Sequence, residues 1–206
     1  GDSIDAIPEY IRKMPANVIP NYIFRNNGDE TFSKKTKEWG LDNPGASAGA
    51  AYADFDNDGD LDLVVSNEND YASMYRNNNE KIVKNNFLKI KFEGDIKNRF
   101  GIGAKVTLYA GGKQLFQEQS PVRGYQSTVE QSLNFGVGQN ATIDSLIVIW
   151  PNDNMQQLSA VKANQTITLR LSEATAKWNY DTTSRSEAAM LSANASSYIR
   201  HTENEF

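Results

Sequence analysis

Closely spaced aspartates dominate the chemistry that this sequence could perform. They are Asp54, Asp56, Asp58, Asp60 and Asp62. Carboxylates this close repel one another, so we expect a cation among them. Oxygen ligands at alternate positions around a tight glycine turn, here at Gly59, are how many proteins wrap Ca²⁺. The pattern predicts a calcium loop over residues 54–62, with an acidic turn that holds no ion as the alternative.

The residues that follow distinguish this loop from an EF-hand. Residues 61–65 are apolar and β-branched, which is typical of a strand. An EF-hand would need a flanking helix and a bidentate glutamate at position 12, where this sequence has Val65. We therefore expect a calcium loop that leads directly into a strand. Its expected ligands are the side chains of Asp54, Asp56, Asp58 and Asp62 and the backbone carbonyl of Asp60.

Composition excludes several classes of function. The chain has 206 residues, a formal net charge of −5 and no cysteine. The five aspartates of the loop account for that charge, so no excess of Lys or Arg remains to bind a nucleic acid backbone. The absence of cysteine excludes disulfides and cysteine metal sites. The longest apolar run, residues 146–150, is too short to span a bilayer.

Hydrophobic patterning predicts an all-β chain. Before residue 83 we expect short strands in hairpins, and residues 21–27 resemble residues 72–78 in a way that suggests repeated propeller blades. After residue 86, alternation and regular turn signals predict an antiparallel sandwich or barrel. The six strands expected there are 87–92, 104–109, 114–119, 127–133, 143–150 and 165–171. The expected divisions are an N-terminal segment (1–20), a calcium-binding β region (21–82), a β domain (86–171) and an extended tail (172–206).

Two families share motifs with this chain. Residues 21–32, residues 49–53 and the 54–62 loop resemble FG-GAP/VCBS repeats, whose hairpins form calcium-loop propeller blades. Residues 86–170 resemble the ASPIC/UnbV domain. The motifs that carry this second resemblance are Asn86-Phe87-Leu88-Lys89-Ile90, Gly101-Ile102-Gly103, Leu133-Asn134-Phe135-Gly136-Val137-Gly138 and Trp150-Pro151-Asn152.

The resemblance implies a place and a role for the chain. ASPIC/UnbV domains follow FG-GAP-like propellers in secreted or surface proteins, among them animal cartilage acidic proteins. The sequence motif around residues 38–42 is most similar to those of large Bacteroidetes surface proteins. This resemblance implies that the chain is a fragment of such a protein and is continued by a following segment. We expect an extracytoplasmic, cell-surface, outer-membrane or secreted scaffold that is not an enzyme. The implied partners are other surface proteins, including SusC/SusD-type glycan importers, or a glycan.

An enzymatic alternative stays open. Residues 45–49 match G-x-S-x-G, the motif of a nucleophile elbow, but a strand and an acidic loop follow instead of a helix. The one available base, His201, lies in the tail. A carbohydrate-active or hydrolytic protein would need carboxylates that the sequence does not identify. Tryptophan can stack on sugars, but core packing is its commoner role, and the candidates are Trp39, Trp150 and Trp178.

Overall fold

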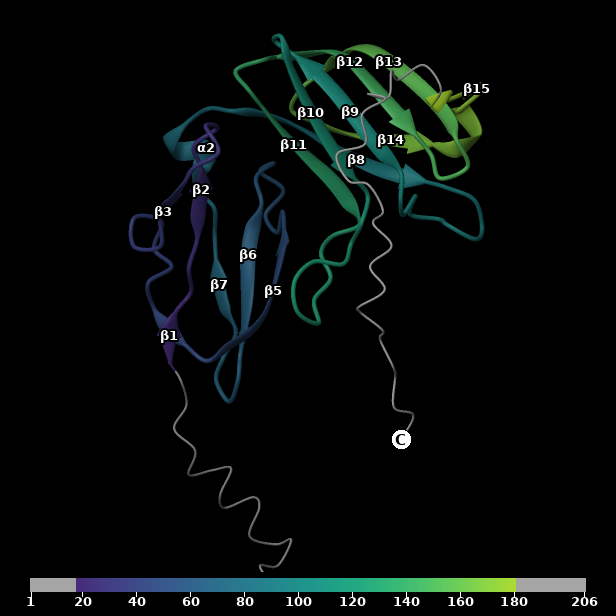
Figure 1. Cartoon of the computed structure of the whole chain (residues 1–206). Helices are drawn as coiled ribbons and strands as arrows, with labels where there is room; N and C mark the ends of the chain where they lie inside the picture. The colour runs from purple at the N-terminus through teal and green to yellow at the C-terminus, as the bar shows by residue number, and fades with distance from the viewer. Residues whose placement is uncertain (1–17, 181–206) are drawn as a thin grey trace, which may run out of the picture.

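A computed structural model describes residues 18–180 and confirms the all-β class. Within that range the chain forms two units joined by a short helix, α2 (Asn79–Ile82). Figure 1 shows the first unit, in purple and blue, beside the second unit, in teal to yellow. Predictions for residues 1–17 and 181–206, including the role of His201, lie outside the described residues.

The first unit consists of small antiparallel sheets. β1 pairs with β4, β2 pairs with β3, and β5, β6 and β7 form a three-stranded sheet in that order. Their bounds are Ile19–Pro20 (β1), Phe24–Asn26 (β2), Phe32–Lys34 (β3), Pro44–Gly45 (β4), Ser47–Ala53 (β5), Asp62–Asn67 (β6) and Ser73–Tyr75 (β7). Residues 54–61 connect β5 to β6 and Asp62 is the first residue of β6, so the β5–β6 hairpin positions the loop 54–62.

The second unit is a sandwich of two sheets. A five-stranded sheet has the order β10-β9-β12-β13-β15, and a three-stranded sheet has the order β11-β8-β14. All pairs are antiparallel except β14 with β8, which is parallel. The bounds are Asn86–Glu93 (β8), Lys105–Ala110 (β9), Lys113–Glu118 (β10), Ser132–Gly138 (β11), Thr142–Ile149 (β12), Asn154–Lys162 (β13), Gln165–Arg170 (β14), Leu171–Glu173 (3₁₀ helix η2) and Ala176–Lys177 (β15).

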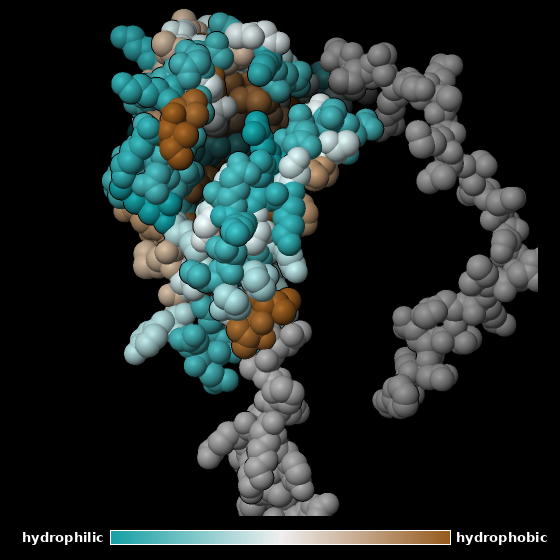
Figure 2. All heavy atoms as spheres, turned by 90° about the vertical axis from the view of Figure 1, so that its left-hand side faces the viewer, coloured by the Kyte–Doolittle hydropathy of each residue, from teal (hydrophilic) through white to brown (hydrophobic). Residues whose placement is uncertain are grey.

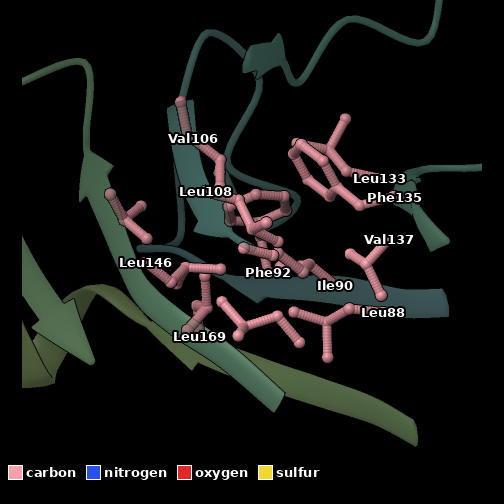
Figure 3. Packing of buried hydrophobic residues seen from close by; sticks show 14 of the residues in the cluster. Leu88, Ile90, Phe92, Val106, Leu108, Leu133, Phe135, Val137, Leu146 and Leu169 are labelled. Carbon is pink, nitrogen blue, oxygen red and sulfur yellow. The ribbon is translucent and has the colours of Figure 1, made fainter. Parts of the chain in front are cut away.

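Period-two alternation builds the core of this sandwich. Successive side chains of a strand point to opposite faces, so Leu88, Ile90 and Phe92 of β8 face inward. Figure 3 shows them packed with Phe135 and other buried side chains from both sheets. Trp150 is buried as well, with its ring edge-on to Phe92. The same alternation directs Lys89 to the outer face of the three-stranded sheet, toward the first unit.

One strand predicted from the sequence was misplaced, and another strand was missed. Residues 127–133 were expected to form a strand, but the strand begins only at Ser132, because residues 121–131 form a loop with one isolated bridge, Val122 to Thr128. Strand β13 was missed because much of it is exposed and polar, which hides the alternation. β15 pairs with β13, so the five-stranded sheet continues past residue 171.

Candidate metal centre

The β5–β6 hairpin closes the acidic loop, the name used here for residues 54–62. Ala53 pairs with Asp62 in the ladder, which brings the two ends of the loop together. The carboxylate of Asp62 then accepts hydrogen bonds from the backbone N–H of Phe55 (3.1 Å) and of Asn77 (2.8 Å). One buried side chain therefore ties the loop to its own start and to the segment after β7.

Glycine is required at the turn of this loop. Gly59 has φ +99°, a conformation that L side chains rarely adopt. A Cβ at this position would lie 2.0 Å from the ring of Phe87. The sixth position of the loop is therefore fixed both by its own backbone and by the strand of the second unit that packs against it.

The acidic loop brings its carboxylates together in two overlapping groups. Carboxylate oxygens of Asp54, Asp56 and Asp58 lie within 4.8 Å of one another. A second group has the same spacing and consists of Asp58, Asp60 and Glu80 of α2. Asp62 is in neither group, and its two oxygens accept the backbone hydrogen bonds described above.

Two basic side chains lie against the carboxylates of the acidic loop itself, and a third, Lys81, is 3.6 Å from Glu80. Arg76 is 2.7 Å from Asp56, 3.0 Å from Asp58 and 3.1 Å from Glu80. Lys89 lies 3.6 Å from Asp54. A hydrogen bond to Asp58 raises the pKa of Arg76 above its ordinary value. The protein therefore supplies part of the positive charge that the acidic loop needs, but fewer cations than carboxylates.

The pKa values of two carboxyl groups, Asp58 and Asp60, reflect the negative charge that the basic side chains do not neutralise. Burial, followed by repulsion from Asp58, raises the pKa of Asp60 to about 6. Burial opposes ionisation of Asp58 too, but hydrogen bonds from the Asp60 N–H and from Arg76 outweigh it and lower its pKa. One carboxylate of the pair is thus stabilised as an anion and its neighbour is destabilised.

Several oxygens at this site are buried and lack a hydrogen-bond donor among the described residues. They are Asp54 Oδ1, Asp60 Oδ1 and Glu80 Oε2. A buried carboxylate oxygen without a donor is costly, and a cation removes that cost. The atoms available as metal ligands are all carboxylate oxygens, which are hard ligands and suit Ca²⁺ better than a soft metal. The Asp-rich cluster can therefore hold a metal ion.

Three residues of this site were not identified from the sequence. Arg76, Glu80 and Lys89 lie on β7's C-terminal side, on α2 and on β8, away from the acidic loop in sequence. For Lys89 a signal did exist: alternation places it on the face of β8 opposite the core residues, so its partners, Glu130 and Asp54, had to come from outside the apolar core. For Arg76 and Glu80, the sequence holds only i,i+4 spacing, which is common on exposed surfaces.

The other candidate residues have ordinary structural roles. Ser47 of the G-x-S-x-G motif lies in β5, and its hydroxyl donates a hydrogen bond to Asn67. Trp150 belongs to the core, Trp178 packs edge-on to Tyr180, and Trp39 is exposed. Within residues 18–180, no helix has the length and apolar character needed to cross a membrane.

Comparisons with known proteins agree with this two-part organisation. A family model for an FG-GAP-like repeat matches residues 17–65, and a model for ASPIC and UnbV matches residues 94–176. The mouse cartilage acidic protein 1 (Mus musculus) is 30% identical over 168 residues, covering 78% of this chain and 25% of that protein. The human cartilage acidic protein 1 (Homo sapiens) is 32% identical over 152 residues, covering 70% and 22%. The chain spans about a quarter of these relatives' length.

Proposed function

This chain contains an FG-GAP-like repeat followed by an ASPIC and UnbV domain, and we propose that it acts as a calcium-stabilised, non-enzymatic binding or scaffold module. The two domains together indicate an extracellular, adhesion-type module. FG-GAP-like repeats generally bind calcium, and the acidic loop lies at the end of the matched repeat. Calcium binding by this particular loop is the part that needs a test.

The observation that supports the proposal most directly is the unsatisfied hydrogen-bonding state of the Oδ1 atom of Asp54. It is buried without a donor among the described residues, and its carboxylate belongs to the group with Asp56 and Asp58. Arg76 supplies charge to Asp56 and Asp58, so Asp54 Oδ1 is the oxygen in this group for which an ion is the most direct partner. The ion would have a structural role, because it would offset repulsion within the β5–β6 hairpin.

The size of the expected stabilisation follows from mass action. Extracellular calcium modules bind with dissociation constants of roughly 0.1–1 mM. At calcium about tenfold above that constant, binding to the folded state adds about 1.4 kcal/mol to the free energy of unfolding. We expect calorimetry to detect calcium binding and EDTA to lower the melting temperature.

A matched pair of variants makes this test specific. Asp56→Ala removes a carboxylate of the group and should abolish the effect of calcium on the melting temperature. Asp42→Ala removes an exposed aspartate outside the acidic loop and should preserve it. Melting curves of the unmodified chain that coincide in calcium and in EDTA would contradict the proposal.

The proposed binding role extends to surface partners. The Bacteroidetes resemblance suggests an outer-membrane setting with SusC/SusD-type importers, and a glycan as a candidate ligand. A cleft of about 490 Å³ between the units is consistent with a ligand, since Tyr52, Phe116 and Gln117 supply aromatic and amide groups. Co-purification of those membrane proteins, or retention of the chain on a glycan array, would support this role.

The hydrolytic alternative has one structural feature in its favour. Glu118 and Glu130 are carboxylates outside the acidic loop, and both line the same cleft. Against it, Glu130 lies 2.9 Å from Lys89 and is engaged in that ion pair. Turnover of a polysaccharide panel that is lost in Glu118→Gln would favour the enzyme over the scaffold.

A further inference from the structure

The acidic loop contacts the second unit at several points. On the second unit, the residues that meet it lie on the outer face of the three-stranded sheet. Asn134 of β11 donates a hydrogen bond to the carbonyl of Gly59 (3.0 Å), and Phe87 of β8 packs directly against the same glycine. Lys89 of β8 faces Asp54. The loop that would hold the ion is therefore also the loop that holds the second unit.

Asp54 takes part both in the candidate ion site and in the contact with the second unit, through its two carboxylate oxygens. Its Oδ2 atom is 3.6 Å from the ammonium of Lys89. Its Oδ1 atom has no donor among residues 18–180 and lies on the carboxylate that groups with Asp56 and Asp58. The side chains of Asp54 and Lys89 are only 4% and 7% exposed, so the bridge between the units is shielded from water.

Lys89 is held from a second direction. Glu130, in the loop before β11, lies 2.9 Å from the same ammonium, so Lys89 sits between a carboxylate of each unit. A buried pair of this kind adds little net stability, because desolvation offsets much of the attraction. Its geometry depends on where the acidic loop places Asp54.

We propose that an ion bound to the acidic loop fixes the orientation of the two units through Asp54 and Lys89. This inference rests on the calcium binding proposed above. Without the ion, repulsion among the carboxylates spreads the loop and moves Asp54 and Gly59 away from Lys89 and Asn134. With the ion, the loop is compact and both contacts to the second unit are made. Lys89 is thus a positioning residue that transmits metal binding to the interface.

Distance measurements between spin labels test this inference directly. The chain has no cysteine, so Tyr71→Cys and Ile96→Cys give two unique labelling sites, one on each unit. Both native side chains are exposed, at 92% and 82%, so labels there should not disturb packing. We expect one narrow distance distribution in millimolar calcium and loss of that narrow peak in EDTA.

Calorimetry on the same labelled protein separates the two proposals. Binding of calcium without any change in the distance distribution overturns the coupling and leaves the calcium site intact. No detectable binding overturns both. Binding accompanied by sharpening of the distribution supports both.

Variants then identify the residue responsible. Lys89→Met should still bind calcium but keep the broad distribution in its presence, whereas Lys91→Met, an exposed lysine on the same strand, should behave like the unmodified chain. A narrow calcium-dependent peak in Lys89→Met would overturn the role of Lys89. If Lys89→Met does not fold, Asn134→Ala tests the second contact, and an unchanged narrow peak there would count against the interface mechanism.

Discussion

The two units of this chain are stabilised in different ways. The second unit buries a continuous apolar cluster between its two sheets, including Leu88, Phe135 and Trp150. Among the described residues of the first unit, only Leu41 and Val65 are buried hydrophobic residues. The second unit therefore resembles an ordinary sandwich with its own core, whereas the first has little apolar burial of its own.

The first unit compensates with polar contacts. Its strands are short, and many of its aromatic side chains, such as Phe24, Phe32 and Trp39, are exposed. Figure 2 shows a mainly hydrophilic surface over this unit, with a small apolar group beside the start of the described chain. Hydrogen bonds to Asp62, ion pairs to Arg76 and contacts with the second unit take the place of a core. A unit built this way should respond strongly to ions and weakly to apolar truncation.

The largest effect should come from the core of the second unit. Phe135→Ala removes a buried ring between the sheets and should lower the free energy of unfolding by about 3–5 kcal/mol. Phe116→Ala is the matched control, because Phe116 is 58% exposed. Chemical denaturation followed by tryptophan fluorescence measures both. Equal losses in the two variants would show that burial does not distinguish these positions.

A smaller effect should come from the carboxylate that closes the acidic loop. Asp62→Asn replaces one acceptor oxygen with a donor, opposite a backbone N–H that already donates. Hydrogen bonds to charged groups contribute about 1.5–3 kcal/mol, and we expect a loss within that range. Urea denaturation in EDTA isolates this term from any contribution of a bound ion.

The control for this prediction is Asp42→Asn, at an exposed position of the same unit. It should leave the urea midpoint unchanged. If Asp62→Asn matched that control in EDTA but weakened calcium binding, Asp62 would act as an ion ligand, as the sequence pattern predicts, and its hydrogen bonds would contribute little.

The same contrast explains what could be predicted from the sequence. In the second unit, β8 and β14 could be recognised because apolar residues, which face the core, alternate with polar residues along the sequence of each strand. β13 left no such record, since its side chains that pack against the core include Leu158 and Val161, which are three residues apart and not two. The 127–133 prediction failed because β-branched residues there lie in a loop, and propensity alone does not place them.

The site was predictable only as far as it is local. The acidic loop could be identified because its aspartates are the right type of ligand and lie at regular spacing within one short segment of the sequence. The cations that meet it, Arg76 and Lys89, come from β7's flank and from β8, so their approach depends on tertiary structure. Glu80 reaches the site from α2, a one-turn helix that is too short to give a helical pattern of apolar residues in the sequence.

The last prediction concerns the backbone at Gly59, where the two units meet. Gly59→Ala imposes a positive φ on an alanine and places a Cβ 2.0 Å from Phe87. Strain of this kind costs about 1–3 kcal/mol, and the clash adds displacement of the strand beside it. We expect a lower thermal midpoint together with weaker contact between the units.

Gly28→Ala separates the two causes. Gly28 has a similar φ of +83°, but no atom lies within 4 Å of its Cβ position. It should therefore show the backbone strain alone. A larger loss for Gly59→Ala than for Gly28→Ala would measure the packing of the acidic loop on β8. Equal losses would mean that β8 yields to the added methyl group, and that the first unit depends less on its neighbour than its sparse core implies.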